Sequence, residues 1–375
     1  METKKRERAT KSDEPIPHRP FSIEASKLDK ISGSRLGSTN ILYIKNYQGG
    51  ILDLRFLDEV HTLLVLVIIS PDNVDQEITT KDWILPISPR IPSFSLYGVR
   101  PDLSSIDTFS TWGLEFFALH KVDYTDCSHQ HLDRLMARCL ELITSHFPSL
   151  PKLDCAEKIT IIDCDIDVLD FNKINSKILK ELEFKIGKHG SISNEHLRQI
   201  RQINSLEELS LDILNSTNSV EHHINYSLLD GHPNLRALSV RGIKDSFDIP
   251  RLPSLETLSL SDIASEEIDL SPLADSKLLR GLDIVMDTYH KYPELERFDL
   301  SPLSVCTNLQ WVRISNTGTA EIDLTPLLHI ESLEDVFIDN WWGGRTKLTV
   351  DSRFKGNIKS PSISSMEMNG KIEWR

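Results

Sequence analysis

Apolar residues recur along this chain in a fixed frame whose first, fourth and sixth positions are hydrophobic, while the positions between them are mostly polar. The clear copies are Leu179-Leu182-Phe184, Leu206-Leu209-Leu211, Leu235-Leu238-Val240, Leu255-Leu258-Leu260, Leu279-Leu282-Ile284, Leu309-Val312-Ile314 and Leu333-Val336-Ile338. Weaker copies are Thr39-Leu42-Ile44, Leu63-Leu66-Ile68, Ile91-Phe94-Leu96, Leu114-Phe117-Leu119 and Ala156-Ile159-Ile161. Because side chains alternate across a strand, each frame predicts a short strand with one buried face.

The spacing of the frames indicates a repeat architecture. The start-to-start intervals are 24, 28, 23, 42, 23, 27, 29, 20, 24, 30 and 24 residues. Such self-similarity is typical of a solenoid, in which each unit buries its apolar edge against its neighbours. We therefore expect about 12 repeats over residues 39–342. The one long interval contains apolar residues at helical spacing, which predicts a longer amphipathic helix inserted near residues 129–147 on the convex side.

A second phrase fills the return path of several repeats. It reads Ile268-Asp269-Leu270-Ser271-Pro272-Leu273, Phe298-Asp299-Leu300-Ser301-Pro302-Leu303 and Ile322-Asp323-Leu324-Thr325-Pro326-Leu327, with a degenerate copy at Leu52-Asp53-Leu54-Arg55-Phe56-Leu57. We expect the Ser or Thr to cap a helical turn whose first position is proline, where the missing N–H does no harm. The flanking leucines should point into the core, so the convex side should consist of short helical or 3-10 turns.

The two ends of the chain break the pattern. Residues 1–38 are polar and proline-containing, so we expect a disordered N-terminal arm. Residues 343–375 alternate apolar and polar positions around glycines, which predicts a β-rich C-terminal cap over the last repeat.

Composition narrows the class of protein. The formal net charge is −14, and residues 1–38 hold nine Lys/Arg and six Asp/Glu, which leaves 33 basic and 50 acidic residues in the remainder. An acidic body argues against a general nucleic-acid binder, which needs a basic footprint. Five scattered cysteines, with no apolar signal core and no run long enough to cross a bilayer, favour a cytoplasmic protein that does not enter a membrane.

These phrases resemble the leucine-rich repeat family, and specifically intracellular repeats with a short convex side, over about residues 39–342. The resemblance implies an α/β horseshoe solenoid whose concave parallel β-sheet binds other macromolecules, most often proteins. The family's usual Asn, three places after the last frame leucine, is replaced by Gly187, Leu214, Ile243, Ile263, Asp287, Thr317 and Trp341. We expect apolar packing by Ile243 and Ile263 to substitute for the missing Asn ladder.

Motifs for chemistry are weak. The acidic run Asp163–Asp170 invites a calcium interpretation, but an EF-hand needs Gly and Glu where Val168 and Ile174 stand. His and Cys residues lack zinc-site spacing, and no phosphate-loop or nucleophile-elbow motif occurs. We therefore expect no metal, no cofactor and no enzymatic activity.

The candidate site is the concave face. Residues between and just outside the frame leucines should point there, and the aromatic and charged ones gather towards the C-terminal end, where Trp and Arg commonly anchor partners. The candidate partner-binding residues are Arg241, Asp283, Trp311, Arg313, Asp335, Phe337, Asp339, Trp341 and Trp342. An equally weighted alternative is that Trp341 and Trp342 pack under the C-terminal cap.

The leading hypothesis is a monomeric, non-catalytic module that binds a protein partner on this face. One alternative is an acidic inhibitor or immunity-type protein that neutralises a basic enzyme. Another is a regulatory subunit of an enzyme such as a phosphatase.

Overall fold

The computed structural model describes residues 20–30, 36, 39–72, 77–87, 89–124, 132–150, 152–153, 155–166, 170–174, 177–186, 192–213, 224–243, 247–264, 268–286, 298–315, 321–339, 347–350 and 372–374. These residues divide between two compact units, Met1–Leu114 and Glu115–Arg375. Each unit is a run of parallel strands joined by short helical turns.

The first unit is organised around a parallel sheet. Its strands, in order of pairing, are β1 (Phe21–Glu24), β2 (Ile41–Lys45), β4 (Val65–Ile69) and β6 (Ser93–Tyr97). A second, short pair joins β3 (Leu52–Asp53) to β5 (Trp83–Ile84) on the return path of the coils. The helical segments are the 3-10 turns η1 (Ala25–Lys30), η3 (Arg55–Glu59) and η4 (Ser110–Trp112) and the helix α1 (Leu103–Phe109), which Asp102 caps by accepting from Ser105 N at 3.0 Å.

Strand β1 lies inside the segment for which we predicted a disordered arm. It pairs in parallel with β2, with Phe21 opposite Leu42 and Ile23 opposite Ile44, and η1 follows it directly. The prediction of disorder is therefore wrong for residues 21–30. The proline-rich composition that suggested it belongs mainly to residues 1–19, which lie outside the described residues.

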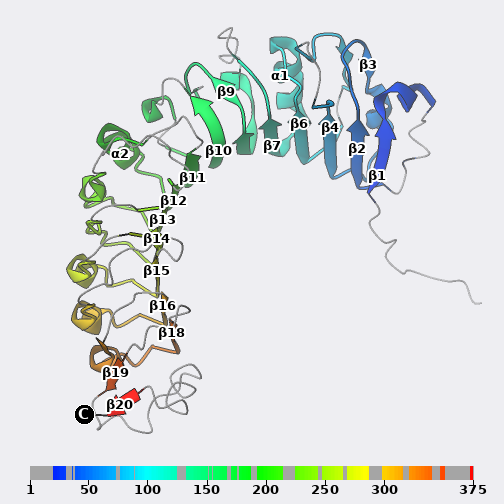
Figure 1. Cartoon of the computed structure of the whole chain (residues 1–375). Coiled ribbons are helices and arrows are strands. Elements are labelled where there is room, and N and C mark those ends of the chain that lie inside the picture. The colour runs from blue at the N-terminus through cyan, green and yellow to red at the C-terminus, as the bar shows by residue number, and fades with distance from the viewer. Residues whose placement is uncertain are drawn as a thin grey trace, which may run out of the picture. The chain divides into compact units, whose positions relative to one another are not determined.

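The second unit holds the longer sheet. Its strands, in order of pairing, are β7 (Leu114–His120), β8 (Ala137–Ile143), β10 (Lys158–Ile166), β11 (Glu181–Ile186), β12 (Glu208–Asp212), β13 (Ala237–Arg241), β14 (Thr257–Ile263), β15 (Gly281–Met286), β16 (Trp311–Ser315) and β18 (Asp335–Asp339), with β9 (His146–Phe147) beside β10. Helical turns lie on the outer side of these strands (Figure 1). They are η6 (Phe171–Lys173), α2 (Asn194–Arg201), η7 (Tyr226–Leu229), η8 (Ser271–Asp275), η9 (Ser301–Val305) and η10 (Thr325–His329).

The frame residues form the core, as predicted. Every frame position in both units is buried except Leu333, and equivalent positions meet in register on neighbouring strands, as Leu238, Leu258 and Leu282 do. The apolar faces stack coil upon coil, so each coil depends on its neighbours for burial. Ile243 and Ile263 are also buried, which confirms that apolar packing replaces the expected Asn at these positions.

The predicted helix over residues 129–147 is wrong, because the strands β8 and β9 lie within that segment. Ala137, Leu140 and Leu142 form a further frame, and all three side chains are buried in register with β10. The helical spacing was misleading, since Met136, on the expected apolar face, is 53% exposed. The long 42-residue interval thus holds one extra repeat of the ordinary kind.

The convex turns are short, as predicted, but their caps differ from the prediction. In η8, η9 and η10 the proline stands at the first or second helical position, and no Ser or Thr side chain caps the turn. The preceding aspartate does this instead: Asp269, Asp299 and Asp323 each accept a hydrogen bond from the backbone N–H two residues on, at 2.8–2.9 Å. Asp53 does the same for Arg55 N at 3.1 Å. This local Asx turn competes well with helix and so keeps each turn short.

A second recurrent feature is a turn at or near the end of seven of the described strands. Two places after the last frame residue the backbone takes a positive φ, and this holds for Asn46, Gly98, Lys121, Thr144, Asp163, Gly242 and Asp262. Left-handed backbone costs little for Gly and is tolerated by Asn and Asp. The turn moves the chain from the sheet to the return path, and the register of β10 and β14 shifts at this point.

Near the C-terminus a small parallel sheet joins β17 (Glu321–Asp323), β19 (Lys347–Val350) and β20 (Ile372–Trp374). Strands therefore occur in the segment for which we predicted a β-rich cap; its boundaries and its capping role stay predictions. In the part of the chain that the structure describes, no helix has the length and apolar character needed to span a bilayer.

Candidate protein-binding face

The second unit exposes the side chains that alternate with its frame residues, and these form rows across the sheet, here called the open face. The first row has one residue on each successive strand from β11 to β18, and neighbouring members are opposite one another. Its members are Glu181, Glu208, Ala237, Thr257, Gly281, Trp311 and Asp335. In the second row the equivalent residues are Glu183, Ser210, Ser239, Ser259, Asp283, Arg313 and Phe337. The predicted orientation of these positions is confirmed, because the frame residues beside them are buried.

Trp311 lies flat across the neighbouring strand. A Cβ atom built on Gly281 would overlap Cζ2 and Cε2 of the indole and would lie 2.8 Å from its Nε1, so the ring covers the glycine backbone. Trp311 nevertheless remains 37% exposed. Gly281 is thus the residue that allows the ring to reach over β15 towards β14.

Beside the indole lies an open hollow of about 290 Å³, which we call the groove. Its floor consists of short side chains from β12, β13 and β14, namely Ser210, Ala237, Ser239, Thr257 and Ser259. Trp311 lines one end, and Lys158, Glu181, Glu183 and Glu208 line the other. The groove is therefore open because its middle strands carry small residues between larger walls.

The end of the groove opposite Trp311 is here called the acidic wall. It consists of Lys158, Glu181, Glu183 and Glu208, and it therefore holds more negative than positive charge. Lys158 is paired with Glu181 at 2.7 Å, and this hydrogen bond raises the pKa of the lysine. Glu183 accepts only a 3.4 Å hydrogen bond from the Thr160 hydroxyl, and within the described residues Glu208 makes no ion pair. Lys158 also interacts with the charge of Glu183, so one ammonium faces three carboxylates in this part of the lining.

The same negative potential reaches Glu141 on β8. Burial, and next the charge of Glu183, raise the pKa of Glu141. His120 Nε2 lies 3.9 Å from Glu141 Oε1, but burial lowers the pKa of His120 to about 4, so at neutral pH this histidine supplies no compensating charge.

Beyond Trp311, the open face carries a mixed-charge cluster. Arg313 Nε lies 3.9 Å from Asp283 Oδ1, and the guanidinium stands 5.6 Å from the ring centroid of Phe337, within cation–π range. Burial raises the pKa of Asp283, and Arg313 partly offsets this. The cluster is electrically balanced and lies outside the groove.

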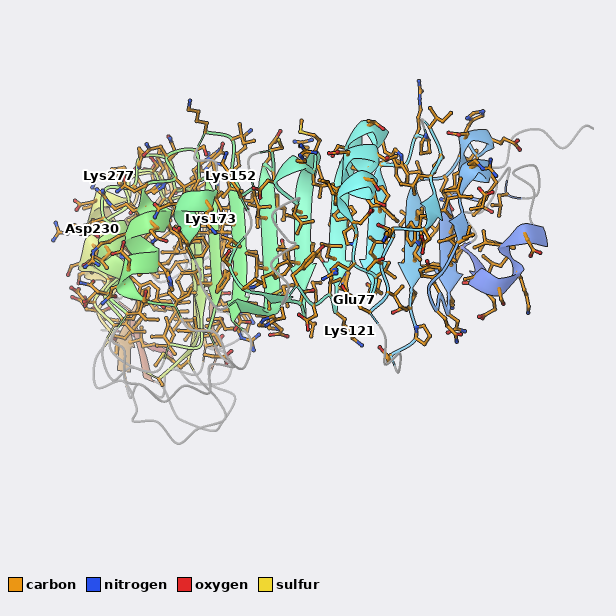
Figure 2. All side chains as sticks on the ribbon, turned by 90° about the horizontal axis from the view of Figure 1, so that it is seen from above. Glu77, Lys121, Lys152, Lys173, Asp230 and Lys277 are labelled. Carbon is orange, nitrogen blue, oxygen red and sulfur yellow. The ribbon has the colours of Figure 1, made fainter. Side chains whose placement is uncertain are left out.

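Arg241, at the end of β13, also has acidic partners that offset its charge. Its Nε contacts Asp262 at 2.5 Å and its Nη1 lies 3.8 Å from Asp212. A further row of ion pairs runs along one edge of the strands, where Arg236 joins Glu207 at 3.6 Å and Glu256 at 2.5 Å. The cations of the sheet are thus mostly partnered, which sets the acidic wall apart. Other cations lie away from the face: Lys173, in η6, is on the outer side of the unit (Figure 2).

The predicted site residues are only partly brought together. Five of them lie on the adjacent strands β15, β16 and β18, namely Asp283, Trp311, Arg313, Asp335 and Phe337. Asp335 is exposed and Phe337 is half-buried. Arg241 lies apart from them on β13. Asp339 ends β18, opposite Ser315. Trp341 and Trp342 lie outside the described residues, so neither of the two interpretations of them is tested.

Sequence reasoning missed the residues that shape the groove. Gly281, Glu183 and Glu208 were not among the candidates, although they fall on the predicted face. The sequence did contain a signal for the groove. Gly281 and Trp311 hold equivalent positions in successive repeats, so the smallest and the largest side chain lie opposite each other on neighbouring strands. Among the described residues, no group of three or more His, Cys, Asp or Glu side chains is arranged to hold a metal ion.

Taken together, the repeated frame, the parallel strands and the short convex turns define a leucine-rich-repeat solenoid. No family model matches the sequence, and no curated protein matches it. Similar solved structures include an internalin from Listeria monocytogenes, with 15% identity, TM-score 0.41, and coverage of 85% of this chain and 77% of the other. A leucine-rich-repeat protein from Leptospira interrogans has 14% identity, TM-score 0.43, and coverage of 95% and 100%. A TLR13–ssRNA13 complex has 15% identity and TM-score 0.46, and the match covers 95% of this chain but only 65% of that one.

Proposed function

We propose that this protein is a non-catalytic interaction module that binds a protein partner in the groove of its second unit. The observation that carries the proposal is the groove itself, in which a half-exposed tryptophan stands over a floor of small side chains. In protein interfaces, binding energy concentrates on large aromatic side chains that the bound partner covers and shields from water. The half-buried hydroxyl residues of the floor line the hollow and can exchange hydrogen bonds with a partner's backbone.

A protein partner fits this face better than a nucleic acid does. Phosphate recognition requires unpaired Lys or Arg side chains. In the groove Lys158 is already neutralised by Glu181, and Glu183 and Glu208 would repel phosphates.

We also propose that the protein acts as a monomer in the cytoplasm. The cytoplasmic location is supported by Cys139, Cys155, Cys164 and Cys306, which form no disulfide among the described residues, since reduced cysteines are usual in reducing compartments.

The test is to fill the groove without disturbing the core. Ser239→Trp places a bulky side chain on the floor, whereas Ser304→Trp adds the same side chain at an exposed position in η9 on the other side of the coil. Each variant and the wild type are used as bait in extracts of cells that carry this sequence, after chemical cross-linking. A partner retained by the wild type and by Ser304→Trp, but lost by Ser239→Trp, supports the proposal. Equal retention by Ser239→Trp contradicts it.

A further inference from the structure

The charges of the groove specify the chemistry of what binds there. Its lining carries the carboxylates of Glu181, Glu183 and Glu208 and the ammonium of Lys158, a formal charge of −2. Lys158 is hydrogen-bonded to Glu181 at 2.7 Å and also interacts with the charge of Glu183, so a single ammonium serves three carboxylates and the lining keeps its excess negative charge. Three other cations of the open face, Lys185, Arg241 and Arg313, are outside the lining, and the two arginines face aspartates.

Glu183 and Glu208 are placed to act on one cation. They lie on the adjacent strands β11 and β12 as diagonal neighbours, since Glu208 is opposite Glu181 and Glu183 is opposite Ser210. Both side chains are exposed and border the same hollow. A planar guanidinium has five N–H donors and can engage two carboxylates at once.

The other end of the groove suits the rest of such a side chain. One face of the Trp311 ring covers Gly281, while 37% of the residue remains exposed to the groove and solvent. Adjacent strands are about 4.8 Å apart, so the three intervals from β12 to β15 span roughly 14 Å. That width admits one polypeptide segment, with a cationic or aliphatic side chain against the indole.

Resting on the function proposed above, we infer that the groove binds a basic segment of its protein partner, with a Lys or Arg side chain held by Glu183 and Glu208 and a neighbouring part of the segment packed against Trp311. The Ser and Thr hydroxyls of the floor then face the backbone of that segment. Charge complementarity selects the basic segment, and the tryptophan fixes its position.

The inference is tested with a defined probe, a random dodecapeptide library displayed on phage and selected against the full-length protein. We expect Lys and Arg to be enriched in the bound peptides, and Ser239→Trp to block their binding. An enriched peptide is then synthesised twice, once with its Arg or Lys and once with the uncharged replacement citrulline or norleucine.

Calorimetric titration of both peptides gives the decisive comparison. Against the wild type, the neutral replacement should weaken binding about tenfold or more, as for a charge-assisted hydrogen bond. Against Glu183→Gln/Glu208→Gln the two peptides should bind equally. Trp311→Ala should also lose about tenfold in affinity. The matched control Glu331→Gln/Glu334→Gln removes the same charge from exposed positions outside the groove and should change affinity less than twofold.

The outcomes separate the two proposals. Bound peptides that lack Lys and Arg but are still blocked by Ser239→Trp overturn the inference and leave the binding face in place. Equal loss on neutral replacement in the wild type and in Glu183→Gln/Glu208→Gln overturns the inference as well. Selection of no peptide, or only of peptides that Ser239→Trp does not block, overturns both.

Discussion

The contact between Trp311 and Gly281 predicts a strong coupling between these two positions. Glycine within a strand is less favourable than alanine by about 0.5–1 kcal/mol, because it loses more backbone freedom on folding. Gly281→Ala would therefore stabilise the protein if nothing stood above the strand. In this fold the new methyl group would overlap the indole, and carbon atoms pack at about 3.5–4.0 Å, so the ring must shift by more than an ångström.

Overpacking of this kind costs about 1–3 kcal/mol. Because Trp311 is already 37% exposed, the ring can swing outwards, which places the cost in the lower half of that range. Gly281→Ala should thus destabilise the wild type by about 1 kcal/mol and stabilise the Trp311→Ala variant by about 0.5–1 kcal/mol. The expected coupling energy is about 2 kcal/mol.

Urea unfolding of the wild type, both single variants and the double variant, followed by far-UV circular dichroism, measures this coupling. Additive effects within about 0.5 kcal/mol would show that the ring does not lie on Gly281. The reasoning about the groove would then lose its tryptophan wall.

Three further predictions concern stability. Asp299→Ala should cost about 0.5–2 kcal/mol by removing the cap of η9, while Asp299→Asn keeps the acceptor; equal urea midpoints for both would contradict the cap. Leu303→Ala, at a fully buried position, should cost about 2–5 kcal/mol, and a loss below about 1 kcal/mol would refute its core role. Burial holds the pKa of His120 at about 4 and lowers that of His232 below its usual 6.5, so the unfolded chain binds protons that the folded state refuses. Stability should fall as pH drops below about 6.5, by up to ~1.4 kcal/mol per pH unit for each histidine, and His120→Gln should reduce this slope; an unchanged slope would exclude it as the cause.

The spacing of apolar residues was sufficient to predict the strands, because the frame demands an alternation that only a strand satisfies. It failed at residues 129–147, where the small Ala137 weakens the frame and the surrounding leucines also match helical spacing. It failed again at the N-terminal end, since β1 draws its order from pairing with β2 and not from its own composition. The composition of a short segment does not show which other strand it will pair with.

The candidate site was predicted less well for a related reason. Trp311 and Arg313 could be identified from their residue types, but the groove depends on which side chains are opposite one another on successive strands. That Gly281 is beside Trp311, and Glu208 beside Glu181, follows only from the register, which the variable intervals between repeats conceal. The Asx caps were missed because the prediction assigned the cap to the Ser or Thr before the proline, whereas the capping residues, Asp299 and its equivalents, lie two positions earlier.

The floor of the groove has a consequence for how such a protein changes over time. Ser239, Thr257 and Ser259 alternate with leucines that point the opposite way into the core, so a substitution at these positions need not disturb packing. Lengthening any one of them would redraw the contour of the hollow, and swapping its polarity would alter the preferred occupant. The residues that determine binding are therefore different from those that determine folding. Single substitutions on the floor could change the binding specificity while the fold is kept.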